Sequence, residues 1–144
     1  LQRSNPAAAL AHYQDSLKIR QTLARREPDN AEWQHDLSVS YDKVGDILQR
    51  SDPAAALAFY QTSLKIAQGL AKREPDNLQT ETDLVISYIK LAEFHPILPL
   101  ADARAYLQAA LDTALSLQQR GLLGSDQADW PTEIRQRLEA LPSS

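Results

Sequence analysis

Cysteine and methionine are both absent from this chain of 144 residues. Without cysteine the chain can form no disulfide bond, no thiolate metal site and no cysteine nucleophile. Glycine is scarce, with 4 residues, and the 8 prolines are dispersed, so there is no flexible linker or low-complexity tract. Because position 1 is leucine and not methionine, we expect the sequence to be part of a longer chain.

Long apolar runs and blocks of one charge are also missing. No stretch approaches the roughly 18 to 20 apolar residues that span a bilayer, and the N-terminus lacks a basic-then-apolar signal segment. The net charge is -4 with both signs mixed, so no basic patch is available for a phosphate backbone. We therefore expect a soluble, cytoplasmic protein that binds neither membrane nor nucleic acid. Hydrophobic residues make up 43% of the sequence, enough for one domain with a core.

An internal repeat is the main feature that is present. The opening segment LQRSNPAAAL returns as LQRSDPAAAL from Leu48, and residues 1–47 match the following 47 residues at 29 positions without a gap. A weaker third copy follows at the same spacing and diverges after Gly121. We therefore expect one domain over 1–144, organised as units 1–47 and 48–94, a partial third unit 95–121 and a C-terminal capping helix 130–142.

Each repeat unit is expected to contain two helices. Asn5 and Asp52 each place a side-chain acceptor at a helix N-cap, directly before a proline at the first helical position. Apolar residues then recur every three or four positions, and no strand pattern competes with this period. The expected helices are 6–26, 31–50, 53–73, 78–94, 101–120 and 131–141.

Prolines and acidic residues also predict where the second helix of a unit ends and the next helix begins. Pro28 and Pro75 disfavour helical geometry at the residue before each of them. Asp29 and Asp76 are each followed three residues later by Glu or Gln, which is the spacing of a capping box. We therefore predict that these two aspartates cap the next helices.

The segments YDKVGDI and PAAALAFYQTSL resemble the tetratricopeptide repeat, a family of stacked helix–turn–helix units. Tyr41, Val44 and Gly45 match the aromatic, large apolar and glycine positions of that family's first helix. The matches in the second helix are Ala56, Tyr60, Ser63 and Leu64, with Ser63 in place of the family's alanine. In the later units Ala92 replaces the family's glycine and Leu107 replaces its aromatic residue.

The repeat of 47 residues is longer than the family's unit of about 34. About two extra turns in each helix account for the difference and keep the apolar face in register. This long-helix form is similar to the extended repeats of kinesin light chain and of many bacterial signalling proteins. The resemblance implies an all-α fold, a right-handed α-solenoid of antiparallel helix pairs with about six helices.

No set of residues in the sequence indicates catalysis. His12, His35 and His95 fall in different contexts without a metal-ligand partner at regular spacing, so we interpret them as surface or boundary residues, with His95 half-buried. There is no Gly-x-Ser-x-Gly turn and no glycine-rich phosphate loop, and the acidic residues are spread along helices and caps. We therefore expect no enzyme activity, no catalytic residue, no metal and no cofactor.

The family resemblance implies a binding role, in which the first helices of the pairs line a concave groove for a peptide or partner protein. The residues assigned to this groove are Val39, Asp42, Asp46 and Gln49 in one unit and Ile86, Ile89 and Glu93 in the next. Apolar residues beside acids suit a ligand with apolar and basic side chains. Two alternatives stay open: the acids form only a solvated face, or the isoleucines are buried beneath the third unit.

We therefore expect a non-catalytic protein–protein interaction module. Asp46 and Glu93 stand where the family's carboxylate-clamp form has asparagine, which argues against a receptor for chaperone tails. The alternatives are a structural segment that self-associates through its exposed ends, or a regulatory arm of a fused enzyme. Because helix 6–26 lacks the first helix of its own pair, its apolar face is expected to be covered by a neighbouring domain or a second copy.

Overall fold

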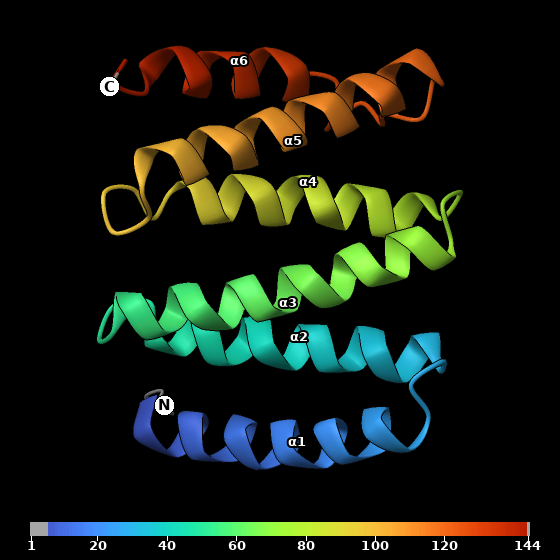
Figure 1. Cartoon of the computed structure of the whole chain (residues 1–144), viewed down its shortest axis with the longest axis vertical. Helices are drawn as coiled ribbons and strands as arrows, with labels where there is room; N and C mark the ends of the chain where they lie inside the picture. Colours follow the sequence, from blue (N-terminus) through green and yellow to red (C-terminus); the bar gives the residue numbers. More distant parts are fainter. Residues whose placement is uncertain (1–5, 144) are drawn as a thin grey trace. The chain divides into compact units, whose positions relative to one another are not determined.

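The computed structural model describes residues 6–143, and within this range the chain forms six α-helices and no strand (Figure 1). This confirms the expected all-α class. Helices α1 and α3 begin and end at the predicted residues. The helices are α1 (Pro6–Arg26), α2 (Ala31–Leu48), α3 (Pro53–Arg73), α4 (Leu78–Ala92), α5 (Leu100–Gln119) and α6 (Trp130–Ala140).

Helix α4 ends two residues earlier than predicted. Pro96 disfavours helical geometry at the residue before it. The backbone amides of Glu93, Phe94 and His95 accordingly bond to carbonyls three residues earlier, at 3.3, 3.1 and 3.4 Å. The end of the helix is therefore a tightened turn instead of a further α-helical turn. Helix α2 also ends two residues early, and α5 and α6 each begin and end one residue before their predicted bounds.

The predicted cap of α3 is present. Asp52 Oδ1 accepts a hydrogen bond of 3.1 Å from the backbone amide of Ala55, and Pro53 occupies the first helical position. A proline loses nothing there, because the amide at that position has no partner inside the helix. The equivalent cap predicted at Asn5 lies outside the described residues.

The capping boxes predicted at Asp29 and Asp76 are wrong by one residue. The N-caps are Asn30 and Asn77, which have extended backbone geometry and accept from the amide three residues later at 3.1 and 3.2 Å. In both turns the asparagine amide bonds back to a glutamate carbonyl, which places the aspartate inside the turn. Asp29 pairs with Arg73 of α3 at 3.3 Å instead.

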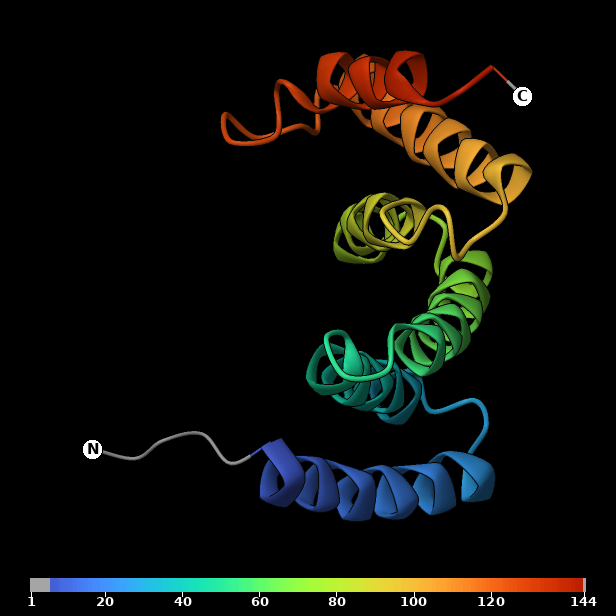
Figure 2. The ribbon, with the colours of Figure 1, turned by 90° about the vertical axis from the view of Figure 1, so that its left-hand side faces the viewer.

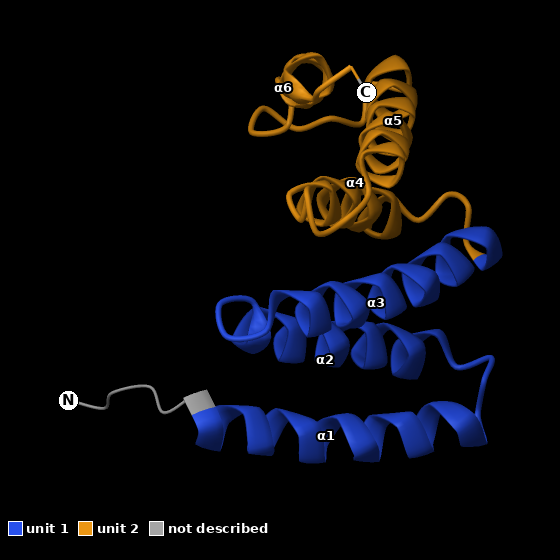
Figure 3. Ribbon diagram, turned by 60° about the vertical axis from the view of Figure 1, so that its left-hand side comes forward, with its two compact units in different colours: residues 1–73 blue, residues 74–144 orange. Residues whose placement is uncertain are grey.

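The helices group into two compact units, residues 1–73 and 74–144 (Figure 3). In unit 1, α2 packs against both α1 and α3. In unit 2, α5 packs against both α4 and α6, and Figure 2 shows α6 lying along α5. The boundary between these units differs from that of the sequence repeats, so each unit combines helices from more than one copy. The expected single domain with its repeat boundaries stays a prediction.

Each unit has its own apolar core. In unit 1 the buried cluster joins α1 to α2 through Leu17, Ala24, Leu37 and Val44. The larger cluster of unit 2 joins α4, α5 and α6 through Val85, Ala92, Leu107, Ala110, Leu111, Ala114, Leu117 and Ile134. Over residues 6–143, no helix combines the length and the apolar character needed to cross a bilayer.

Replacing the cap of α4 tests the corrected start of that helix. Asn77→Ala removes the acceptor for the amide of Thr80 and should lower the free energy of unfolding by about 1 kcal/mol. The matched control Asp76→Ala changes the residue that the sequence favoured and should cost less than about 0.5 kcal/mol. Urea unfolding followed by circular dichroism measures both values. A larger loss for Asp76→Ala than for Asn77→Ala would contradict the assignment.

Candidate functional site

Two helix pairs, α2 with α3 and α4 with α5, share one contact at equivalent positions of the repeat. The rings of Tyr41 and Phe59 have centroids 6.0 Å apart in the first pair. The rings of Tyr88 and Tyr106, each 47 residues farther along, have centroids 6.1 Å apart in the second. Helices α2 and α4 therefore occupy equivalent positions. The residues assigned to the groove lie on these helices or, for Gln49 and Glu93, at their C-caps.

The face predicted on α2 is a stripe of residues spaced three and four apart, which is the spacing of one side of a helix. Val39 and Asp42 are half-buried, whereas Asp46 and Gln49 are exposed. The adjoining side of α2, with the buried Ser38 and the buried Gly45, contacts α3. The stripe is therefore most accessible toward the C-terminal end of α2, at Asp46 and Gln49.

Asp46 has a partner inside unit 1. The hydroxyl of Tyr60 on α3 donates a hydrogen bond to Asp46 Oδ1, and Tyr60 is only 2% exposed. Burial, the bond to Asp46, and the charges of Asp46 and Asp42 together raise the pKa of Tyr60 well above its ordinary value. A phenolate here would lie buried beside two carboxylates, so the proton stays on Tyr60. Asp46 thus holds α3 in place as well as contributing to the stripe.

The ring of Tyr60 lies directly against the backbone of Gly45. A Cβ added to this glycine would be 2.9 Å from Tyr60 Cε1, closer than side chains tolerate. The missing side chain therefore lets the ring pack at this depth. We call the set of Gly45, Asp46 and Tyr60 the Tyr60 contact.

In unit 2, different residues occupy all three positions of the Tyr60 contact. Ala92 stands in place of the glycine and Leu107 in place of the tyrosine, and both are buried in the unit 2 cluster. Leucine is smaller than tyrosine and leaves room for the alanine Cβ. It has no hydroxyl to offer Glu93, which pairs with Arg137 of α6 at 3.2 Å instead.

The two isoleucines predicted on α4 differ in their surroundings. Ile89 is half-buried and packs against the unit 2 cluster. Ile86 is 51% exposed. Glu93, the C-cap of α4, is exposed and follows Ile86 by seven residues, so an accessible apolar side chain and an acid lie about two turns apart.

The histidines lie apart from one another in the chain and in their environments. His12 and His35 are exposed, and His95 is half-buried with Nδ1 3.4 Å from the carbonyl oxygen of Leu98. The structure thus agrees with their interpretation as surface or boundary residues. Within residues 6–143, no group of three or more histidine, aspartate or glutamate residues is arranged to hold a metal ion.

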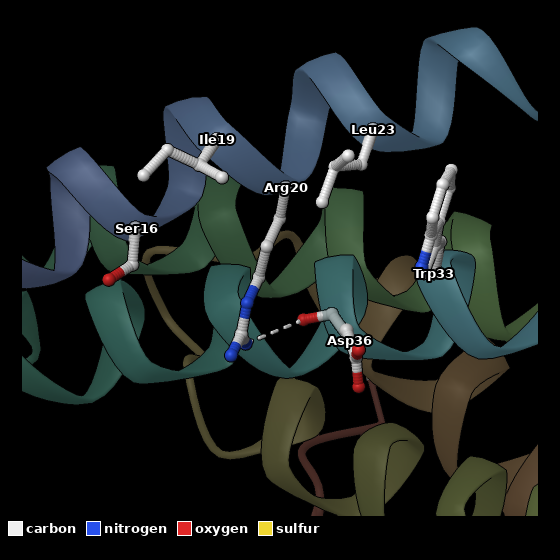
Figure 4. A pocket seen from close by; sticks show the side chains of 6 residues that line it. All are labelled: Ser16, Ile19, Arg20, Leu23, Trp33 and Asp36. Carbon is white, nitrogen blue, oxygen red and sulfur yellow. Dashed lines mark hydrogen bonds between the residues drawn. The ribbon is translucent and has the colours of Figure 1, made fainter.

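A hollow between α1 and α2 is a feature that the sequence did not reveal (Figure 4). Arg20 crosses it from α1, and its guanidinium donates to the carbonyl of Asp36 at 3.2 Å and to the hydroxyl of Ser40 at 2.8 Å. Its volume of about 190 Å³ is below the roughly 300 to 1,000 Å³ typical of small-molecule pockets. The other lining residues are Ser16, Ile19 and Leu23 of α1 and Trp33 of α2.

Comparisons with known protein families, curated proteins and solved structures give no match. What the chain does is therefore inferred from its own residues and their geometry.

Replacing Gly45 and Tyr60 by the residues found in unit 2 tests the close packing of the Tyr60 ring against Gly45. Gly45→Ala should lower the free energy of unfolding by about 1 to 2 kcal/mol, because overpacking outweighs the gain in helix propensity. The double variant Gly45→Ala/Tyr60→Leu reproduces the Ala92 and Leu107 of unit 2. Its loss in free energy of unfolding should therefore be smaller than the sum of the losses in the two single variants. Gly69→Ala is the control: nothing lies within 4 Å of the added Cβ, so it should stabilise by about 1 kcal/mol. Additive losses in the double variant would contradict a shared contact.

Alkaline titration tests the environment of Tyr60. Subtracting the phenolate absorbance curve of Tyr60→Phe from that of the unchanged chain isolates this residue. The difference should show no ionisation near pH ~10, where an unperturbed tyrosine titrates. Because the folded chain holds this proton more tightly than the unfolded chain, the stability from Tyr60 is complete below about pH 10 and falls as the pH rises further. A difference curve with its midpoint near pH ~10 would disprove the assignment.

Proposed function

We propose that this chain is a non-catalytic protein–protein interaction module of the tetratricopeptide type, a short α-solenoid whose first helices bind a peptide or partner protein in the cytoplasm. The observation that carries the proposal is a pattern present in both copies. Val39 on α2, which is half-buried, and Ile86 on α4, which is 51% exposed, are equivalent apolar residues, and each is followed two turns later by an exposed acid. Scattered single apolar residues need no explanation, but a recurring one beside an acid favours a binding surface.

Each acid at the end of these faces has a partner within its own unit. Asp46 accepts from the Tyr60 hydroxyl and Glu93 pairs with Arg137. Both carboxylates belong to exposed residues, so a ligand can approach them. The apolar residue and the acid together favour a ligand segment with apolar and basic side chains.

Helices also provide a rigid platform for such a surface. The adjoining side of α4 is buried through Val85 and Ala92, and another side of α2 is buried through Val44. Binding on a prepared face avoids the ordering cost that a flexible loop would bring. We infer that α2 and α4 each offer such side chains to a ligand, while the second helix of each pair holds its first helix in position.

Selection of short random peptides displayed on phage, with the whole chain as target, tests the proposal. Enriched peptides should combine apolar residues with Lys or Arg. A synthetic copy of the best peptide should bind Ile86→Asp about tenfold more weakly or worse, because burying isoleucine is worth about 1.5 to 3 kcal/mol and tenfold corresponds to about 1.4.

The matched control is Leu122→Asp, which places the same charge at a 38% exposed leucine in the loop before α6. It should leave peptide binding unchanged. Circular dichroism should show the same helix content for both variants. Absence of enrichment, or equal binding by Ile86→Asp and the unchanged chain, would remove the basis of the proposal.

A further inference from the structure

Unit 1 has a second surface, where α1 and α3 flank the first half of α2. Two hollows with volumes of about 390 and 210 Å³ meet here, because Pro28 and Gln34 line both of them. This surface is separate from the stripe on α2, since Val39 lies about 140° around that helix from Gln34. We call it the basic groove, and its defining residues are Arg25 of α1, Gln34 of α2, and Lys65, Gly69 and Arg73 of α3.

The cations of the basic groove are only weakly neutralised. Arg25 and Lys65 are exposed, and neither has an acidic partner within residues 6–143. Arg73 pairs with Asp29 at 3.3 Å, but the Asp29 side chain is 99% exposed, so water screens this pair. The three cations come from two different helices and form no run in the sequence. A local positive surface therefore exists on a chain whose net charge is -4.

This positive charge is specific to unit 1, because unit 2 has acids at two of the equivalent positions. Glu81 stands 47 residues beyond Gln34, and it pairs with Arg120 at 2.6 Å. Asp112 stands 47 residues beyond Lys65. Unit 1 thus has an amide in place of one acid and a cation in place of the other. The basic groove is therefore a local change of the repeat and not a general property of its helices.

A glycine inside α3 keeps the second hollow open. Gly69 is exposed, and a Cβ added there would have no described neighbour within 4 Å. No contact of this kind requires a glycine here, in contrast to Gly45, where the ring of Tyr60 fills the space. Glycine in a helix interior is less stable than alanine, but it allows another backbone to approach closely. Gly69 therefore favours a ligand whose backbone lies in this hollow.

We propose that the basic groove binds an extended acidic segment of a partner protein. Carboxylates of the segment pair with Arg25, Lys65 and Arg73, and its backbone passes over Gly69. Residues 1–5 and 144 contain no aspartate or glutamate, so these ends of the chain do not supply the segment. A short acidic peptide fits better than a nucleic acid, because a long polyanion would also meet the net negative charge of the chain.

A fluorescein-labelled peptide of alternating glutamate and alanine is the probe. Its anisotropy should rise saturably on titration with the whole 144-residue chain, and added salt should weaken the binding. Lys65→Glu should weaken the binding about tenfold or more. The matched control is Lys43→Glu, which makes the same charge change at an exposed lysine nine residues after Gln34, on the opposite side of α2. This control should bind the probe as the unchanged chain does.

A second variant tests the shape of the groove without changing its charge. Gly69→Leu should fill the second hollow and weaken the binding about tenfold or more. It should also raise the urea midpoint of unfolding, because leucine favours a helix more than glycine does. Loss of binding therefore could not result from loss of the fold. Thr22→Leu is the control, since Thr22 is the equivalent residue of α1 and lines neither hollow. It should leave the binding unchanged.

The inference is overturned by absence of saturable binding, by unchanged binding in Lys65→Glu or Gly69→Leu, or by an equal loss in Lys43→Glu. Tighter binding of a labelled single-stranded DNA would make a nucleic acid the ligand. A chain dimer that Lys65→Glu dissociates would make a second copy the occupant.

The source of the acidic segment is tested by repeating the titration on the chain extended by the residues that flank it in its gene. Unchanged binding supports a partner protein, whereas loss of binding would make a flanking segment the occupant and overturn the proposal. Lys65→Glu should still bind the phage-selected peptides, which keeps this test independent of the face on α2 and α4.

Discussion

The approach of the Tyr60 ring to the backbone of Gly45 sets the distance between α2 and α3, and the rest of unit 1 depends on that distance. A side chain at position 45 would push the helices apart at the point where Ser63 meets the Ser38 carbonyl. The same approach brings the Tyr60 hydroxyl to Asp46. One missing Cβ therefore fixes a packing contact, a buried hydrogen bond and the position of an acid on the binding face.

Unit 2 reaches a similar arrangement with different chemistry. Its first and second helices meet through Ala92 and Leu107, and Val85 with Ala110 replaces the hydrogen-bonded serines of unit 1. The acid at the equivalent position is held by Arg137 of the last helix instead of by a hydroxyl. Both pairs keep the ring contact between the two helices, while the polar contacts of unit 1 are replaced by apolar ones in unit 2.

The sequence predicted the helices well because prolines and N-cap residues mark their ends directly. It failed at the caps of α2 and α4, where a turn hydrogen bond shifts the cap from Asp29 and Asp76 to the next residue. The face on α2 and α4 was assigned from the resemblance to the tetratricopeptide repeat, and its spacing of three and four residues fits one side of a helix. The partners of Asp46 and Glu93 could not, because they lie on other helices and depend on how far apart those helices pack. The hollow between α1 and α2 could not be predicted either, because the arginine that crosses it has no equivalent in the later copies.

The divergence between the two helix pairs has a consequence for folding. Copies that agree at 29 of 47 positions can pair with the wrong copy while the chain collapses. If α4 met α3, the Cβ of Ala92 would collide with the ring of Tyr60, and if α2 met α5, Asp46 would face Leu107, which has no hydroxyl. Each wrong pairing therefore lacks either the close packing or the hydrogen bond that stabilises the correct pairing. The substitutions that distinguish the copies therefore favour pairing of each first helix with the second helix of its own pair.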